Sequence, residues 1–208
     1  MINDMDEKLL QQAIDLFDTP EKWEAFCELA NQKDHISQIW CDKVRDAIIT
    51  RFSEEQISNK DKFVLEKDGW DKLNLYLTKV RETKTLRIQV QLKEFRTVVW
   101  MAPEVLNKNS VLEKRDAINV VFKSIQFELN SHDWEPLCSN FPKDIVTEND
   151  WNNCVYHWGH NVDEVANKMY NYYIKPMLSD EGVNLMLDII TNCIQINDHL
   201  HLRHSALQ

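Results

Sequence analysis

Two patterns in the chain could do metal chemistry, and the first is a set of histidines. His157 and His160 lie three positions apart, and His199, His201 and His204 cluster near the C-terminus. A zinc site needs three or four ligands that converge from fixed elements, whereas terminal segments are often poorly ordered. We therefore predict that the protein binds no metal. With only 3 glycines in the chain, we also expect no glycine-rich nucleotide loop and no cofactor.

The second pattern is Gln91-Leu92-Lys93, which follows Asp68 and Asp71. It is similar to that of metal-dependent nucleases of the PD-(D/E)xK type, which place an acid, then an acid or glutamine, then a lysine on one hairpin. There the carboxylates hold hard cations and the lysine stabilises developing charge. The tripeptide is short enough to occur by chance, and Gln91 and Lys93 also fall on the expected wet side of a strand. A nuclease is thus an alternative, while we predict that the protein is not an enzyme.

Residues 133–164, which we call the acidic aromatic segment, place large rings among carboxylates. Aromatic anchors bury area at low entropic cost, and carboxylates steer encounter with Lys and Arg and pair with them. Six residues of this segment are expected to bind a partner: Trp134, Glu135, Asp144, Glu148, Asp150 and Trp151. Aromatic residues are highly buried on average, so the alternative that the rings cap the core and the acids face water stays open.

The charge of the chain indicates what kind of partner to expect. Its formal net charge is −10, from 34 Asp and Glu against 24 Lys and Arg. Residues 1–60 carry 13 acids and 7 bases, residues 61–100 carry 6 and 9, and residues 131–160 carry 5 and 1. A negative surface repels phosphate backbones and attracts basic proteins. We therefore expect a basic protein partner and no direct contact with nucleic acid.

The cysteines and the hydropathy indicate the compartment. Five cysteines stand alone, and no two have the spacing of a zinc or redox motif. The first residues lack the basic start and apolar run of a secretion signal, and no apolar stretch approaches the ~20 residues that span a bilayer. We predict a cytoplasmic protein that makes no membrane contact.

The elements that position these residues begin with helices. Asp18-Thr19-Pro20-Glu21 is a helix start, because it offers a capping side chain, a proline in the first turn and an acid near the positive end of the helix dipole. The helix that follows has an apolar stripe, and residues 36–52 repeat the pattern in another helix. Helical spacing resumes after Pro103, and Ser179 is the expected start of the last helix.

The middle of the chain changes to the period of a strand. Over residues 85–92 every second side chain is apolar, which predicts a strand with one buried and one wet face. The polar side chains on the wet face are Thr85, Arg87, Gln89 and Gln91. Leu73, Leu75 and Leu77 alternate in the same way, and adding residues 63–66 before and 95–101 after gives a four-stranded antiparallel meander, whose inner face helices must cover.

Together these patterns predict one α+β domain over residues 1–208. It has N-terminal helices, a central four-stranded antiparallel meander, and C-terminal helices packed on the sheet. A chain of this length buries about 70% of its unfolded surface, so it needs no metal or disulfide to fold.

In size, acidity and the acidic aromatic segment, the chain resembles the immunity proteins that bacteria keep against their own nuclease toxins. The resemblance implies a non-enzymatic inhibitor whose partner is a cationic RNase or DNase domain. It also implies that inhibition comes from occlusion of the substrate cleft of that domain. A structural or assembly subunit, which would form a stable oligomer through its helices, is the remaining alternative.

Overall fold

The computed structural model describes residues 11–12, 14–142, 145 and 162–194. Contacts divide the chain into two units, Met1–Ile39 and Trp40–Gln208. That the whole chain forms a single domain stays a prediction. Among the described residues, no helix is both long enough and apolar enough to cross a membrane.

The first unit is helical, and its main helix is α2 (Pro20–Asn31). It begins at the predicted signal, since the Thr19 hydroxyl accepts a hydrogen bond from the Lys22 amide at 3.3 Å and Pro20 occupies the first position. No residue of α2 is buried. A second helix, α3 (Lys33–Glu54), starts in this unit and continues into the next.

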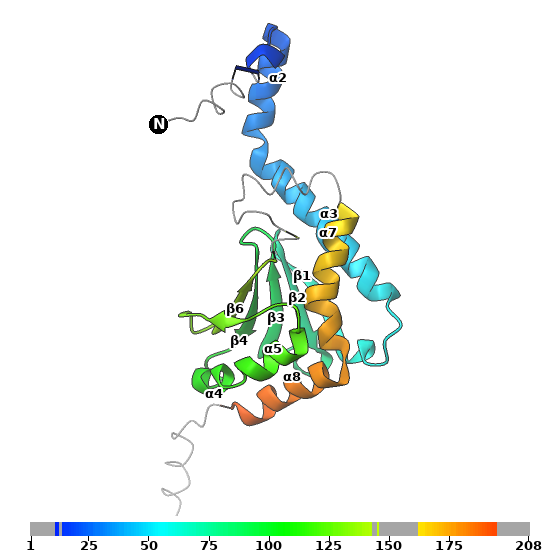
Figure 1. The fold of residues 1–208 in the computed structure, drawn as a ribbon, viewed down its shortest axis with the longest axis vertical. Coiled ribbons are helices and arrows are strands. Elements are labelled where there is room, and N and C mark those ends of the chain that lie inside the picture. The colour runs from blue at the N-terminus through cyan, green and yellow to red at the C-terminus, as the bar shows by residue number, and fades with distance from the viewer. Residues whose placement is uncertain (1–10, 13, 143–144, 146–161, 195–208) are drawn as a thin grey trace, which may run out of the picture. The chain divides into compact units, whose positions relative to one another are not determined.

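The second unit is built on one antiparallel sheet with the strand order β1-β2-β3-β4-β6-β5 (Figure 1). The strands are β1 (Phe63–Asp68), β2 (Lys72–Leu77), β3 (Leu86–Gln91), β4 (Arg96–Met101), β5 (Glu128–Leu129) and β6 (Leu137–Asn140). The predicted meander is present as β1 to β4, but the sheet has six strands, so the prediction of four was imprecise. It missed β5 and β6 because two and four residues are too few to show an alternation.

Helices cover one face of this sheet. In Figure 1, α5 (Arg115–Phe122), α7 (Val162–Met169) and α8 (Asp180–Asn192) lie over it, with the short α4 (Lys108–Leu112) before α5. α7 runs into a π-helical turn (Tyr170–Ile174) and a 3₁₀ turn (Lys175–Leu178), and two further 3₁₀ turns span Lys60–Lys62 and Thr78–Val80. Ser179 caps α8 as predicted, because its hydroxyl accepts a hydrogen bond from the Gly182 amide at 3.1 Å. The α+β class is confirmed, with helices before and after the sheet along the chain.

The core of the second unit lies between the sheet and these helices. The apolar side of the strands meets Phe122 of α5, Tyr170 after α7 and Met186 of α8. Cys41 and Val44 of α3 join the same cluster and are fully buried. The period-2 apolar residues of the strands and the helical stripes thus bury one another, as their patterns predict.

Cys41 is expected to resist thiol reagents in the folded protein. Loss of hydration raises the pKa of this thiol to about 12, and the nearby Asp71 carboxylate adds to the shift. The thiolate is the reactive form, so hardly any reactive Cys41 exists at pH 8. Mass spectrometry after brief iodoacetamide treatment should find Cys41 unmodified and the partly exposed Cys27 alkylated, with both modified in urea. Equal labelling of the two in the native protein would contradict this expectation.

Candidate binding surface on the polar face of the sheet

The polar side of β3 and its neighbours, which we call the polar face, is buried. Arg87 keeps 8% of its surface exposed, Gln89 keeps 2% and Gln91 keeps 0%. The prediction that this side of the strand is wet is therefore wrong. Burying polar groups is unfavourable unless they are hydrogen-bonded, and these side chains bind one another.

A chain of hydrogen bonds crosses β1, β2 and β3 on the polar face. The Asn74 amide donates to Asp68 Oδ2 at 3.1 Å. Gln89 donates to Asn74 Oδ1 at 2.8 Å, and Gln91 donates to Gln89 Oε1 at 2.7 Å. Asn74 and Gln89 are directly opposite each other in the β2–β3 pairing, so strand pairing itself brings the two amides together.

Glu135, in the loop before β6, accepts the last bonds of this chain of hydrogen bonds. Gln91 donates to its Oε1 at 2.9 Å, and Arg96 Nη2 donates to its Oε2 at 2.9 Å. Arg96 also donates through Nε to Gln91 Oε1 at 2.7 Å and pairs with Glu94 at 2.5 Å. The Glu135 side chain is 17% exposed. Its carboxylate is therefore held by an internal ion pair, which limits what it can offer to a partner.

Trp134 stands beside Glu135 and is open to solvent. It is 47% exposed, and its ring centre lies 5.3 Å from that of Trp100 on β4. On its other side, Asp133 accepts a hydrogen bond from Lys108 at 2.9 Å, and this bond lowers the pKa of the Asp133 carboxyl. An exposed ring flanked by carboxylates has the composition of an interface anchor.

Arg87 lies on the same face, against Trp100. Its guanidinium carbon is 3.7 Å from the centre of the Trp100 ring, and its Nη1 donates to the Tyr76 hydroxyl at 3.2 Å. Trp134, Trp100, Arg87 and Tyr76 therefore form a row in which a cation is enclosed by aromatic rings.

Two of the six predicted partner-binding residues, Trp134 and Glu135, come together at this face. Trp134 presents an exposed ring, whereas Glu135 is bound to Arg96. The other four lie outside the described residues: Asp144, Glu148, Asp150 and Trp151.

The residues of the nuclease alternative make other contacts. Asp68 accepts the hydrogen bond from Asn74, and Lys93 Nζ lies 5.0 Å from the centre of the Trp70 ring. Asp71 is buried, and the loss of hydration raises the pKa of its carboxyl. Within the described ranges, no three His, Cys, Asp or Glu side chains gather as metal ligands. The geometry of these residues therefore adds nothing in favour of a nuclease.

Sequence reasoning missed the burial of the polar face and the roles of Tyr76 and Trp100. A signal was present in the kind of polar residue. Exposed sheet surfaces commonly carry charged side chains that oppose association, whereas Asn74, Gln89 and Gln91 are neutral amides. Each amide offers both donors and an acceptor, so amides on neighbouring strands can satisfy one another away from water.

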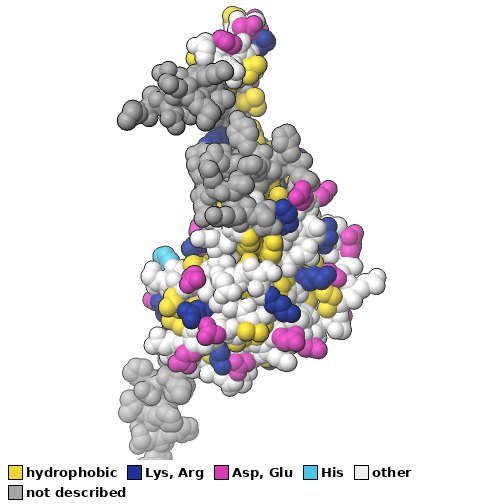
Figure 2. All heavy atoms as spheres, viewed as in Figure 1, with side chains coloured by type: hydrophobic (Ala, Val, Ile, Leu, Met, Phe, Trp, Pro, Cys, Tyr) yellow, Lys and Arg dark blue, Asp and Glu magenta, His cyan; other side chains and the backbone are white. Residues whose placement is uncertain are grey.

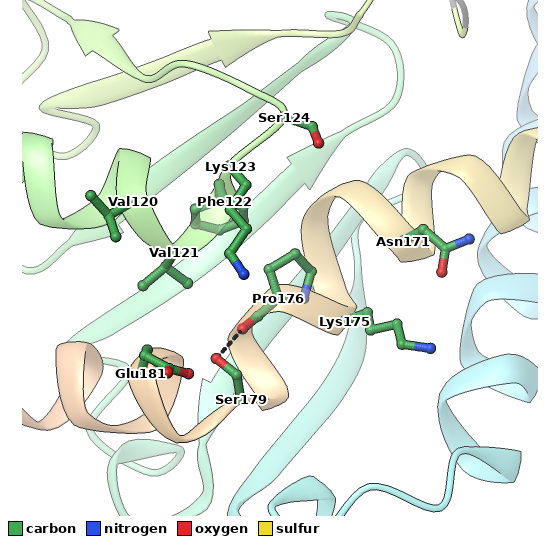
Figure 3. A pocket seen from close by; sticks show the side chains of 10 residues that line it. All are labelled: Val120, Val121, Phe122, Lys123, Ser124, Asn171, Lys175, Pro176, Ser179 and Glu181. Atoms are coloured by element: carbon green, nitrogen blue, oxygen red, sulfur yellow. Dashed lines mark hydrogen bonds between the residues drawn. The ribbon is translucent and has the colours of Figure 1, made fainter.

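A separate pocket of about 370 Å³ lies on the helical side, between the end of α5 and the start of α8 (Figure 3). Lys123 in its wall has a φ of 54°, a strained value for a residue other than glycine. The Ser124 amide closes this tight turn by donating to the Phe122 carbonyl at 2.5 Å. In Figure 3 the Lys123 ammonium group points towards Pro176 and Ser179, and Glu181 lies beside Ser179. This pocket shares no residue with the polar face.

The first unit exposes apolar side chains among acidic ones. Of the twelve exposed large hydrophobic residues in the described part of the chain, seven fall within residues 14–39. We call them the N-terminal stripe: Ile14, Leu16, Trp23, Phe26, Leu29, Ile36 and Ile39. Figure 2 shows hydrophobic and acidic side chains together on the part of the chain that contains α2. Large apolar side chains that are exposed in number and surrounded by polar residues mark interaction sites.

Trp134 at the edge of the polar face and the N-terminal stripe are thus the exposed features that stand out among the described residues. Comparisons of the chain with family models, with curated proteins and with solved structures find no match.

Proposed function

We propose that the protein is a non-enzymatic binding protein that docks on a basic protein partner and occludes it. The observation that carries the proposal is the N-terminal stripe, in which exposed rings and aliphatic side chains are interspersed with carboxylates. An immunity protein, the class that the chain resembles, would use such a surface on a cationic nuclease domain.

The spacing of the stripe on α2 suits a helix that lies in a groove. Trp23 and Phe26 are three positions apart, so they share one face of the helix, and their ring centres are 5.5 Å apart. Helix-in-groove recognition uses apolar anchors at this spacing. Burial of each such side chain contributes about 1.5–3 kcal/mol. Because α2 has no buried residue, these anchors are not used in the core.

Charge selects the partner. Residues 1–39 carry nine acids and three bases, a net charge of −6. Two copies that met through this surface would bring like charges together, whereas a groove rimmed by Lys and Arg would be attracted. A nuclease domain has such a rim because it must bind phosphates.

Trp134 supports the same proposal from the second unit. Its ring is half-exposed, rests on Trp100, and has the carboxylate of Asp133 next to it. Rigid aromatic side chains of this kind are enriched among the residues that dominate binding energy.

The full chain is expected to bind a basic amphipathic peptide through the stripe. The probe is a peptide of about 18 leucines and lysines with the leucines on one helical face, and its scrambled isomer has the same charge without that face. Isothermal titration at low salt should show the amphipathic peptide binding at least about tenfold more tightly, because it alone can bury Trp23 and Phe26.

Two variants locate the binding site. Trp23→Ser with Phe26→Ser should abolish the preference for the amphipathic peptide, whereas Val120→Ser on α5, at a side chain that is 69% exposed, should keep it. Equal affinity of the wild type for both peptides would contradict the proposal. So would a dimer, seen by sedimentation of the pure chain, that the double variant abolishes, because a second copy would then occupy the stripe.

A further inference from the structure

Among the described residues of the second unit, three arginines are largely withdrawn from solvent, and two of them are paired with carboxylates. Arg45 pairs with Asp42 at 2.5 Å and also donates to the Gly69 carbonyl at 2.8 Å. Arg96 pairs with Glu94 and with Glu135. Both follow the rule that a buried charge is paired with an opposite charge.

Arg87 is the exception. It is 8% exposed, and its contacts in the described structure are the Tyr76 hydroxyl and the faces of Tyr76 and Trp100. Its Nε is buried and donates to no group. Among the described residues Nη2 has no acceptor either. Because Nη2 is not among the buried atoms without a partner, it reaches the surface. No carboxylate of the described residues lies within ion-pair distance of Arg87.

The rings cannot replace a counter-charge. The face of Trp100 attracts a cation that lies over it, but it offers no acceptor in the plane of the guanidinium. The hydrogen bonds that the guanidinium can still make point along that plane, and Nη2 is the donor that an oxyanion from solvent can reach. Arg87 is thus a pre-positioned cation whose Nη1 is bound to Tyr76 and whose Nε and Nη2 have no acceptor among the described residues.

We propose that Arg87 binds an oxyanion, a carboxylate or phosphate group, at the edge of its guanidinium that carries Nη2. Trp100 fixes the plane of the guanidinium, Tyr76 holds Nη1, and the exposed Trp134 ring next to Trp100 provides an apolar wall for whatever carries the anion. The source of the group is either a small free anion or a carboxylate side chain of a docked protein. The inference does not rest on the N-terminal stripe or on a basic partner.

The test follows the arginine side chains of the full chain directly. The protein is labelled with ¹⁵N-arginine, and the Nε–Hε signals are recorded as sodium phosphate or sodium acetate is added, against sodium chloride at equal ionic strength. Arg87→Lys identifies the Arg87 signal. That signal should move and saturate below about 100 mM with at least one oxyanion and not with chloride. The signals of Arg45 and Arg96, which are already paired, should not follow it.

The arms of the titration distinguish the sources. Saturation by phosphate alone indicates a free phosphate-type ligand. Saturation by acetate and by an acetylated Gly-Glu-Gly amide indicates a carboxylate side chain. Absence of a saturable, oxyanion-specific shift at Arg87 overturns the proposal, as does an equal shift at Arg45 and Arg96.

A second measurement separates binding from a structural role. The thermal midpoint of the wild type should rise in the effective oxyanion relative to chloride, and Arg87→Met should remove that rise. If the rise persists in Arg87→Met, the anion binds elsewhere and the proposal fails. Should Arg87→Met not fold, Arg87→Lys keeps the charge but loses the planar fork, and it should weaken the oxyanion effect at least about fivefold. An unchanged effect in Arg87→Lys overturns the proposal equally.

Discussion

Gly182→Ala should lower the free energy of unfolding by about 3 kcal/mol or more. Gly182 lies in the first turn of α8, where its amide binds the Ser179 hydroxyl at 3.1 Å and its Cα faces the backbone of Met177. A Cβ at this position would overlap the carbonyl oxygen and Cα of Met177. These are backbone atoms of a 3₁₀ turn, so no side-chain rotation relieves the overlap. Urea unfolding followed by circular dichroism measures the loss.

Gly69→Ala is the matched control for that experiment. Gly69 has a φ of 56°, but nothing lies within 4 Å of an added Cβ. Alanine there takes on only the strain of the left-handed conformation, about 1 kcal/mol. Gly182→Ala should therefore be clearly less stable than Gly69→Ala. Equal losses would show that α8 shifts away from Met177 at little cost.

Arg96→Met should lower the free energy of unfolding by about 3 kcal/mol. Arg96 is the cation that joins Glu94, Glu135 and the buried Gln91 amide. Its removal leaves the Glu135 carboxylate, which is 17% exposed, without its counter-charge and leaves Gln91 Oε1 without its donor. An orphaned buried acceptor and an uncompensated charge are both strongly unfavourable. Thermal or urea unfolding of the purified variant measures the effect.

Two further variants test this explanation. Arg81→Met breaks an ion pair with Glu66 whose side chains are 50% and 31% exposed, so it should lower the stability by less than about 1 kcal/mol. Glu135→Gln added to Arg96→Met should recover part of the loss, because it removes the uncompensated charge. If Arg81→Met and Arg96→Met have equal effects, the network of the polar face does not stabilise the fold beyond a surface ion pair.

The parts of the fold that were predictable are those with local signals. The start of α2 at Pro20 and the cap of α8 at Ser179 each depend on a few adjacent residues. The strands β2 and β3 follow from a period of two, and β1 and β4 are the short apolar runs on either side of them. These signals need no knowledge of what lies across the core.

The parts that escaped prediction depend on distant residues. The strand β6 forms by pairing with β4, for example Val98 with Cys138, and β5 pairs with β6 in turn. No local periodicity in the sequence predicts these pairings. The alternation placed Gln89 and Gln91 on one side of β3 correctly. It could not show that Asn74 and Glu135 would satisfy them there and so allow burial. For the candidate site, Trp134 was found from composition alone, whereas Arg87 was interpreted as an ordinary solvated base.

The N-terminal stripe shows that a local pattern also fails to predict exposure. The pattern on α2 is typical of a helix that packs on a core, yet Trp23 and Phe26 stay exposed. A periodic stripe indicates that a helix has an apolar face. Whether the same chain covers that face depends on the rest of the fold.

The row of amides on the polar face has a consequence for how the chain folds. If β3 slipped by one position against β2, Gln89 and Gln91 would turn to the leucine-rich side and their apolar neighbours would take their place. Every amide would then lose its partner at once, and once the helices docked these amides would be buried among apolar side chains without partners, so the misaligned sheet is disfavoured. Valines in place of the amides would remove that penalty, because both faces of the strand pair would then be apolar and either could be buried. The row of amides therefore favours the correct alignment of β3 against β2 over an alignment shifted by one residue.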